Sequence, residues 1–211
     1  MQFTFVMNVY REPVALVQRA LVSYKAQYPT AHYVVVGDGA WDADLADLLS
    51  DIPYVARGKR HKTPELGHLY TQQWCREGLR WPADVIFKID PDSEMHHAFR
   101  SIPDADYFGR SYRAADRRGL RRNRRIIWGA CIGFSRQLLE RFLSEGLLDR
   151  PDLAARSLYK QGQFSEDVFL SRVCEEHEIP MTGWGEVRML SQMAPSAHER
   201  EHYAVTAHYG A

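Results

Sequence analysis

The chain has 211 residues, of which 45% are hydrophobic and 26% charged, as in an ordinary globular protein with a sizeable core. Lysine plus arginine and aspartate plus glutamate both number 27, so no net charge attracts nucleic acid or a membrane surface. The composition excludes a disulfide-rich secreted protein and a zinc-finger framework, because the three cysteines (Cys75, Cys131 and Cys174) are widely spaced.

The N-terminal half alternates predicted strands and helices. Strands are expected where aromatic and β-branched residues run together, and helices where apolar residues recur at helical spacing. In chain order these elements are a strand at 3–9, a helix at 12–26, a strand at 32–39, a helix at 42–49, a short strand at 54–57, a helix at 64–79 and a strand at 84–89. This alternation predicts a largely parallel sheet with helices on both faces.

The C-terminal half is less regular. We expect strands at 106–110, 126–134 and 183–190, helices at 135–145 and 165–177, and an irregular tail at 191–211. The chain contains no internal repeat, no linker and no apolar run of the roughly 20 residues that span a bilayer. The sequence therefore predicts a single domain over 1–211, and the apolar start without a basic leader indicates a cytoplasmic protein.

Two aspartates follow the predicted strand at 84–89. Asp90 and Asp92 stand one residue apart, and carboxylates this close repel each other unless a positive charge lies between them. Oxygen ligands of this kind suit Mg²⁺ or Mn²⁺, ions that also bind phosphate oxygens. The alternative is a solvated turn in which Asp90 caps backbone amides. Turns that follow parallel strands meet at one edge of the sheet, so residues 8–11 and Asp38 are expected beside this pair.

A second charged feature is a run of eight arginines between Arg110 and Arg125. We interpret this run as a hairpin or loop beside the ligand-binding edge, either simply solvated or gripping an anionic ligand through bidentate phosphate contacts. A nucleic-acid patch is the third interpretation, and we do not expect it because the rest of the chain balances the charge. Lys59, Arg60 and Lys62 form a smaller basic group near the same edge.

Six motifs in chain order resemble those of GT-A glycosyltransferases, most closely the inverting family-two type. They are FVMNVYREP, VVVGDG, ELGHLYTQQW, FKIDPD, WGACIGFSRQLLERF and SEDVFLSRVC, and together they extend over nearly the whole chain. The resemblance implies an α/β fold of GT-A type, a Rossmann-like three-layer sandwich with a mostly parallel mixed sheet. It also implies a nucleotide-binding half at 1–95, an acceptor-side half at 96–211, and transfer of a sugar from a UDP-sugar to an unknown acceptor, with inversion.

By the same resemblance, a metal ion (Mn²⁺ or Mg²⁺) is expected at the paired aspartates. Asp92 would be its principal ligand, and Asp90 would reach the ribose or, through water, the metal. A histidine late in the chain completes the metal site in many such enzymes, and His208 matches it best. The competing histidines are His96, His97, His198 and His202.

The resemblance also assigns a nucleotide-binding set. It consists of Val9, Tyr10, Arg11, Asp38, Lys62, Gly67 and Asp90. Within this set, Tyr10 and Arg11 would flank the uracil. Asp38 would accept a hydrogen bond from the N3–H of the base, which favours uridine.

The catalytic base implied by the resemblance is Asp167 or Glu166, with Asp167 preferred because relatives usually use the second acid of the pair. Inverting transfer needs a carboxylate that takes the proton of the acceptor hydroxyl. From the residues alone, both acids could equally complement the positive N-terminus of a helix. Trp128, Gly129 and Trp184 lie in segments expected on the acceptor side, although core packing is the commoner fate of tryptophan.

Three other functions compete with a transferase. A protein with this fold could bind a nucleotide without transferring sugar, and only turnover separates the two. A sugar-phosphate nucleotidylyltransferase is expected to have a glycine-rich loop with basic residues directly after the first strand. The corresponding segment here, MNVYREP, contains no glycine. A nucleic-acid binder would use the arginine run and show steeply salt-dependent binding. The sequence identifies neither the sugar nor the acceptor, and retention of configuration also stays open.

Overall fold

The computed structural model describes residues 1–39, 42–114, 124–158, 162–190 and 195–208. The strands are β1 (Phe3–Val9), β2 (His32–Gly37), β3 (Tyr54–Ala56), β4 (Val85–Ile89), β5 (Ser93–Met95), β6 (Tyr107–Ala114), β7 (Arg124–Ser135), β8 (Met181–Gly183), β9 (Val187–Leu190) and β10 (Val205–His208). The helices are α1 (Val14–Gln27), α2 (Ala43–Leu48), α3 (Gly67–Gly78), α4 (Arg136–Ser144), α5 (Pro151–Arg156), α6 (Glu166–Glu176) and α7 (Ala197–His202).

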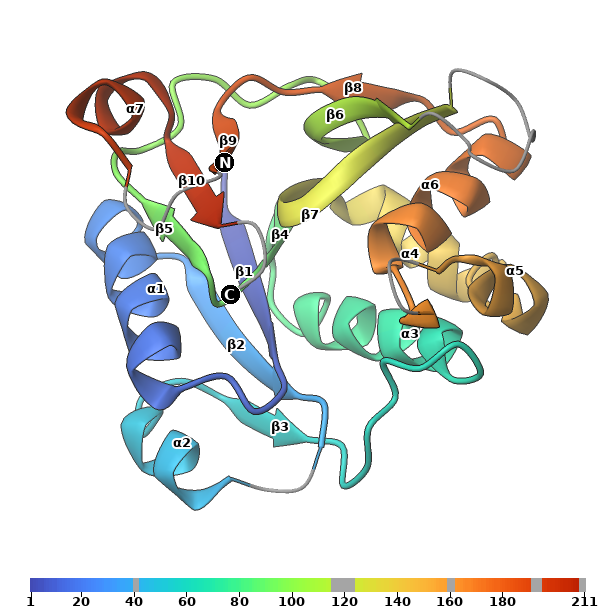
Figure 1. The fold of residues 1–211 in the computed structure, drawn as a ribbon, viewed down its shortest axis with the longest axis horizontal. Helices are drawn as coiled ribbons and strands as arrows, with labels where there is room; N and C mark the ends of the chain where they lie inside the picture. The colour runs from blue at the N-terminus through green and yellow to red at the C-terminus, as the bar shows by residue number, and fades with distance from the viewer. Residues whose placement is uncertain (40–41, 115–123, 159–161, 191–194, 209–211) are drawn as a thin grey trace.

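The strands of the described residues form a seven-stranded sheet in the order β3-β2-β1-β4-β7-β6-β8 and a three-stranded sheet in the order β5-β10-β9 (Figure 1). In the larger sheet, β3, β2, β1 and β4 are parallel neighbours, whereas β7 is antiparallel to both β4 and β6. The sequence explains the parallel part, because β1, β2 and β4 are nearly continuous apolar runs, which suit strands buried on both faces. The expected mostly parallel mixed sheet is confirmed.

Two apolar clusters cover the two faces of the larger sheet. One cluster packs α3, α4, α5 and α6 against the sheet and includes Trp74, Phe134 and Phe169. The other packs α1, α2 and the smaller sheet against the opposite face and includes Phe5 and Phe87. The molecule therefore has three layers with the larger sheet in the middle, as the α/β fold class predicted.

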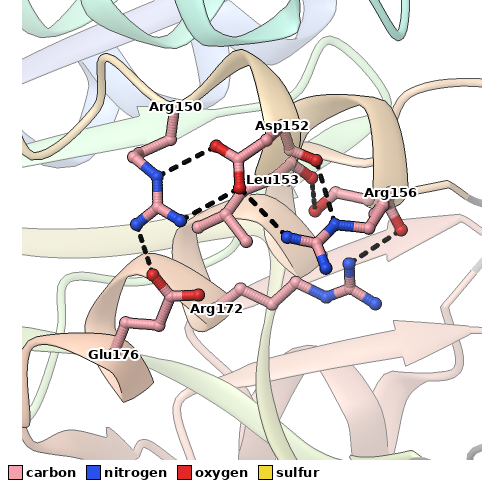
Figure 2. A network of polar contacts seen from close by, with 7 residues as sticks. Arg150, Asp152, Leu153, Arg156, Arg172 and Glu176 are labelled. Carbon is pink, nitrogen blue, oxygen red and sulfur yellow. Dashed lines mark hydrogen bonds and ion pairs between the residues drawn. The ribbon is translucent and has the colours of Figure 1, made fainter.

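A network of charged side chains links α5 to α6 (Figure 2). The Asp152 carboxylate accepts hydrogen bonds from the Arg150 and Arg156 guanidinium groups, each at 3.0 Å, and Arg150 also pairs with Glu176. Arg172 donates to the Arg156 carbonyl oxygen at 2.8 Å. The hydrogen bond from Arg150 lowers the pKa of Asp152 to about 2. Because these side chains are exposed, we assign the network a modest role in orienting α6.

Several elements differ from the sequence prediction. The tail expected to be irregular contains α7 and β10, and β10 lies between β5 and β9 in the smaller sheet. A capping box of Ser196 and Glu199 begins α7 and is the sequence signal that was missed. The strand expected at 183–190 is divided into β8 and β9, and α5 and β5 were not predicted.

Part of the arginine run lies on paired strands, with Arg110 and Arg113 in β6 and Arg124 and Arg125 in β7. These strands pair antiparallel from Tyr107 with Phe134 to Ala114 with Arg124, and residues 115–123, with the other arginines of the run, lie outside the described residues. Among the helices that the structure describes, none has the length and apolar character needed to cross a membrane.

Candidate active site

The turns that follow β1, β2 and β4 lie at the same edge of the larger sheet. β1 pairs with β2 up to Val9 and Gly37, and with β4 up to Met7 and Ile89. The Asp38 amide also donates to the Val9 carbonyl oxygen at 2.7 Å. Parallel neighbours necessarily present their carboxyl ends together, so the predicted meeting of these turns follows from the strand order.

A cavity of about 650 Å³ opens between the first two of these turns, α2 and the loop at 58–60. Its lining includes Val9, Tyr10, Arg11 and Asp38, four members of the predicted nucleotide-binding set. The Tyr10 ring lies 4.4 Å from the Arg60 guanidinium and 5.3 Å from that of Arg11. The volume suits a small-molecule ligand, and an aromatic ring between cations suits a planar one with an anionic tail.

The Asp38 carboxylate holds the loop that forms one wall of this cavity. It pairs with Arg57 at 3.1 Å and accepts the His61 and Lys62 amides at 2.7 and 2.9 Å. Both side chains of the ion pair are buried, and Arg57 also donates to the Tyr70 carbonyl oxygen. The predicted contact between Asp38 and a base stays a prediction. Arg57 was expected only as the last residue of a strand.

Arg57→Met is expected to lower the free energy of unfolding by about 3–5 kcal/mol, because it leaves the buried Asp38 carboxylate without its counter-ion. Chemical denaturation measures this change. Arg141→Met is the matched control, since Arg141 pairs with Glu145 at 3.0 Å on the surface and should contribute about 0.5 kcal/mol or less. Equal losses in the two variants would contradict a structural role for the buried pair.

Lys88 connects the aspartate turn to the N-terminus of α6. Its ammonium nitrogen lies 2.5 Å from Asp90 Oδ1 and 3.3 Å from Glu166 Oε2, and it donates to the Gly129 carbonyl oxygen at 3.1 Å. Burial opposes the charge on Lys88, but Asp90 and Glu166 outweigh it and hold the pKa of Lys88 well above its usual range. The sequence signal for this residue was a lone lysine inside the apolar strand VIFKI.

The two acids at the start of α6 have different surroundings. Glu166 is buried, accepts a hydrogen bond from Trp74 Nε1 and pairs with Lys88, so both oxygens face protein groups. Asp167 is partly buried and lies so close to Gly129 that a Cβ on that glycine would overlap with Asp167 Oδ1. Of the two predicted bases, the geometry favours Asp167.

Burial is the main reason that the pKa of Asp167 is raised to about 7. Lys88 and the hydrogen bond from the Gly129 amide oppose this rise, while the negative charges of Asp90 and Glu166 add to it. A carboxylate with a pKa near neutrality is suited to accept and release a proton at physiological pH.

Asp92 has an unsatisfied oxygen. Its Oδ1 atom is buried and has no hydrogen-bond partner in the part of the chain that the structure describes. Burial, followed by the charge of Asp90, raises the pKa of Asp92 to about 7. A buried carboxylate oxygen without a partner is costly unless a cation or donor binds to it, so the residues at this turn fit a divalent ion.

The predicted histidine ligand lies in β10. Ala207 pairs with Ser93, the residue after Asp92, so the backbone of His208 is placed beside the aspartate turn. Its side chain is outside the described part, and within that part no three His, Cys, Asp or Glu side chains form a metal cluster. Of the competitors, His96 contacts Thr206 Oγ1 at 2.7 Å and His97 contacts the Ala98 carbonyl oxygen at 2.9 Å. The last two, His198 and His202, lie together on α7.

Two predicted site residues pack in the core. Trp184 is buried among Phe87, Phe99 and Phe108 on the face of the sheet opposite α6, and its assignment to the acceptor side stays a prediction. Gly67 was predicted to bind the nucleotide, but it is buried, and a Cβ there would overlap with the Phe164 ring. Its lack of a side chain serves close packing.

Trp128 and Asn8 complete the candidate site. Trp128 is partly buried, and its ring lies 4.7 Å from that of Tyr112 across the β6–β7 hairpin. Asn8 was not predicted as an individual site residue; it is buried near the carboxyl end of β1, and neither amide atom has a partner within the described ranges. Buried amides normally form hydrogen bonds, which makes Asn8 a candidate ligand contact that sequence reasoning did not single out.

Comparisons with known proteins agree on the fold. No family model and no curated protein matches the sequence. A solved structure of an active-site mutant of LgtC matches 99% of this chain and 88% of its own, with a TM-score of 0.64 and 11% identity. The galactosyltransferase LgtC in complex with donor and acceptor sugar analogs matches 98% and 87%, with a TM-score of 0.58 and 12% identity. Together with the mixed seven-stranded sheet, these matches show that the chain has the GT-A glycosyltransferase fold.

Proposed function

We propose that this protein transfers a sugar from a UDP-sugar to an acceptor hydroxyl, with a divalent ion and with inversion of configuration. The observation that carries the proposal is the position of Asp167, whose pKa is raised to about 7: it follows Glu166, which pairs with Lys88, and Lys88 pairs in turn with Asp90 in the aspartate turn. A proton acceptor and a cation-binding turn at the carboxyl edge of a GT-A sheet are the two parts that the reaction needs.

On the donor side, we propose that the cavity beside Tyr10 holds the nucleoside. Arg11, Lys59 and Arg60 line it and supply positive charge for the diphosphate. Asp92, Asp90 and His208 would hold Mn²⁺ or Mg²⁺, and the unpartnered Asp92 Oδ1 supports this assignment. When bound, such an ion supplies positive charge that stabilises the diphosphate as it leaves.

On the acceptor side, Asp167 takes the proton of the attacking hydroxyl. The hydroxyl oxygen forms the new bond to the anomeric carbon while the bond from that carbon to the diphosphate breaks. One displacement inverts the configuration at this carbon. The run of arginines between Arg110 and Arg125 supports an anionic acceptor, since guanidinium groups suit bidentate contacts with carboxylate or phosphate.

Calorimetry with UDP, GDP and ADP, each with and without Mn²⁺, tests the donor half of the proposal. We expect UDP to bind best and only with the metal. A screen of UDP-sugars for release of UDP tests the chemical half. Metal-dependent UDP binding without transfer or hydrolysis of any donor would favour the rival function, a nucleotide-binding protein of GT-A fold.

Gly129→Ala is expected to lower kcat about 100-fold and to leave UDP affinity within a few-fold. The added Cβ would overlap with Asp167 Oδ1, so the carboxylate must move, and displacement of a reacting group by about 1 Å has this cost. Gly185→Ala is the matched control, because no atom lies within 4 Å of a Cβ at that position. A Gly129→Ala variant with unchanged kcat would argue against Asp167 as the base.

A further inference from the structure

The buried Lys88 ammonium group makes two hydrogen bonds and one ion pair within the protein. It donates to Asp90 and to the Gly129 carbonyl oxygen, and it pairs with Glu166. These three partners belong to three different segments: Asp90 to the turn after β4, Gly129 to β7 and Glu166 to α6. One nitrogen therefore joins three segments that meet at the candidate active site.

Each of these contacts ends next to a group with a proposed chemical role. Asp90 belongs to the turn that carries Asp92. The Gly129 peptide accepts from Lys88 through its carbonyl oxygen and donates through its amide to the Asp167 carboxylate. Glu166 directly precedes Asp167 and is held from its other side by Trp74 Nε1. Lys88 thus reaches Asp167 by two independent routes and the cation-binding turn by a third.

We propose that Lys88 is a positioning residue that fixes the separation between the cation-binding turn and the proton-accepting carboxylate of Asp167. It makes this link through the Gly129 peptide and Glu166, without touching either substrate. The inference rests on the proposed function, and it gives a role to a residue of FKIDPD to which the resemblance assigned none. Among the charges of the described residues that act most strongly on Asp167, that of Lys88 is positive, whereas those of Asp90 and Glu166 are negative and repel the carboxylate.

Two variants distinguish a role of Lys88 in positioning Asp167 from a role in stabilising the fold alone. Lys88→Met leaves Glu166 buried without a counter-ion, so its melting temperature should fall. Lys88→Met/Glu166→Gln removes both charges and keeps an acceptor for Trp74, so most of the lost stability should return. If Lys88 positions Asp167, kcat stays about 100-fold below the wild type in both variants, while the KM for the donor changes only a few-fold.

The pH dependence of kcat supplies a readout that a structural role would not move. Lys88 lowers the pKa of Asp167, so in Lys88→Met the acidic limb of the profile should shift to higher pH. Lys25→Met is the matched control, because Lys25 pairs with Asp51 at 2.6 Å away from this cluster. We expect that control to retain the wild-type profile.

Amide exchange in the protein without substrate gives a readout independent of activity. In glycine-labelled protein, the Gly129 amide should exchange at least about 10-fold faster in the double variant, whereas that of Gly133 in the same strand should not change. Unchanged Gly129 exchange together with wild-type kcat in a stable double variant would overturn the proposal. If the wild type neither binds UDP nor releases it from sugar donors, the proposed function fails. The exchange rate of the Gly129 amide would still show whether Lys88 fixes the backbone at Gly129.

Discussion

Asp167→Asn is expected to lower the rate of sugar transfer by about 10²- to 10⁴-fold and to leave metal-dependent UDP binding within a few-fold. Asparagine keeps the size and the hydrogen bond to the Gly129 amide, but it cannot accept the proton of the acceptor hydroxyl. Initial rates give the loss, and calorimetry gives the affinity. A variant with the wild-type rate would remove Asp167 from the mechanism.

The same substitution has a second expected effect, on stability. The pKa of Asp167 is raised to about 7 in the folded protein and returns to about 4 on unfolding, so the folded state holds a proton that the unfolded state releases. This difference makes stability fall as the pH rises from about 4 to about 7. The asparagine side chain carries no charge, so we expect the Asp167→Asn variant to melt above the wild type at about pH 8, with the difference narrowing towards about pH 4. The wild-type rate should correspondingly fall below about pH 7.

Asp92→Ala is expected to abolish the effect of Mn²⁺ on UDP binding, with a loss of affinity of at least about 100-fold in its presence. The substitution removes the buried oxygen that lacks a partner among the described residues, and even residues that only orient metal ligands cost about 10- to 100-fold when changed. Calorimetry with UDP, with and without Mn²⁺, measures the change.

Asp104→Ala, which removes an exposed aspartate outside the turn, serves as the control and should bind like the wild type. Equal metal-dependent affinity in the Asp92 variant would exclude Asp92 as the ligand. It would also leave Asp90 as the remaining aspartate of the turn. Measurement at two ionic strengths separates coordination from a general loss of negative charge.

The parts of the fold that were predictable are those whose signals are local. β1, β2 and β4 are apolar runs bounded by turns, and the rule that ligands bind at the carboxyl ends of parallel strands then locates the edge. The smaller sheet was not predictable, because β10 is short and is stabilised by pairing with β5 and β9, of which β5 is far away in the chain. Its residues carry no distinct pattern of their own.

The site residues divide in the same way. The paired aspartates and the acids of α6 have roles that their motifs imply. No motif implied a role for Lys88, Arg57 or Asn8, whose partners come from other segments or are absent from the described part of the chain. Nothing local distinguishes a lysine that joins three segments from one that reaches the solvent. For Trp184 and Gly67, sequence reasoning missed the core packing that the structure shows, because tryptophan and glycine are common both in ligand sites and in cores.

The strand β10 contributes to the hydrophobic core and also ends beside the candidate active site. Val205 and Ala207 are buried in the core, and the strand continues into His208 beside the turn of Asp92. Docking of this strand would therefore complete the hydrophobic interior and place the backbone of His208, the predicted ligand, beside the aspartate turn in a single event. Removing residues 204–211 would remove buried core residues and the predicted histidine ligand together. A loss of stability and a loss of cation affinity could therefore not be separated by shortening the chain from this end.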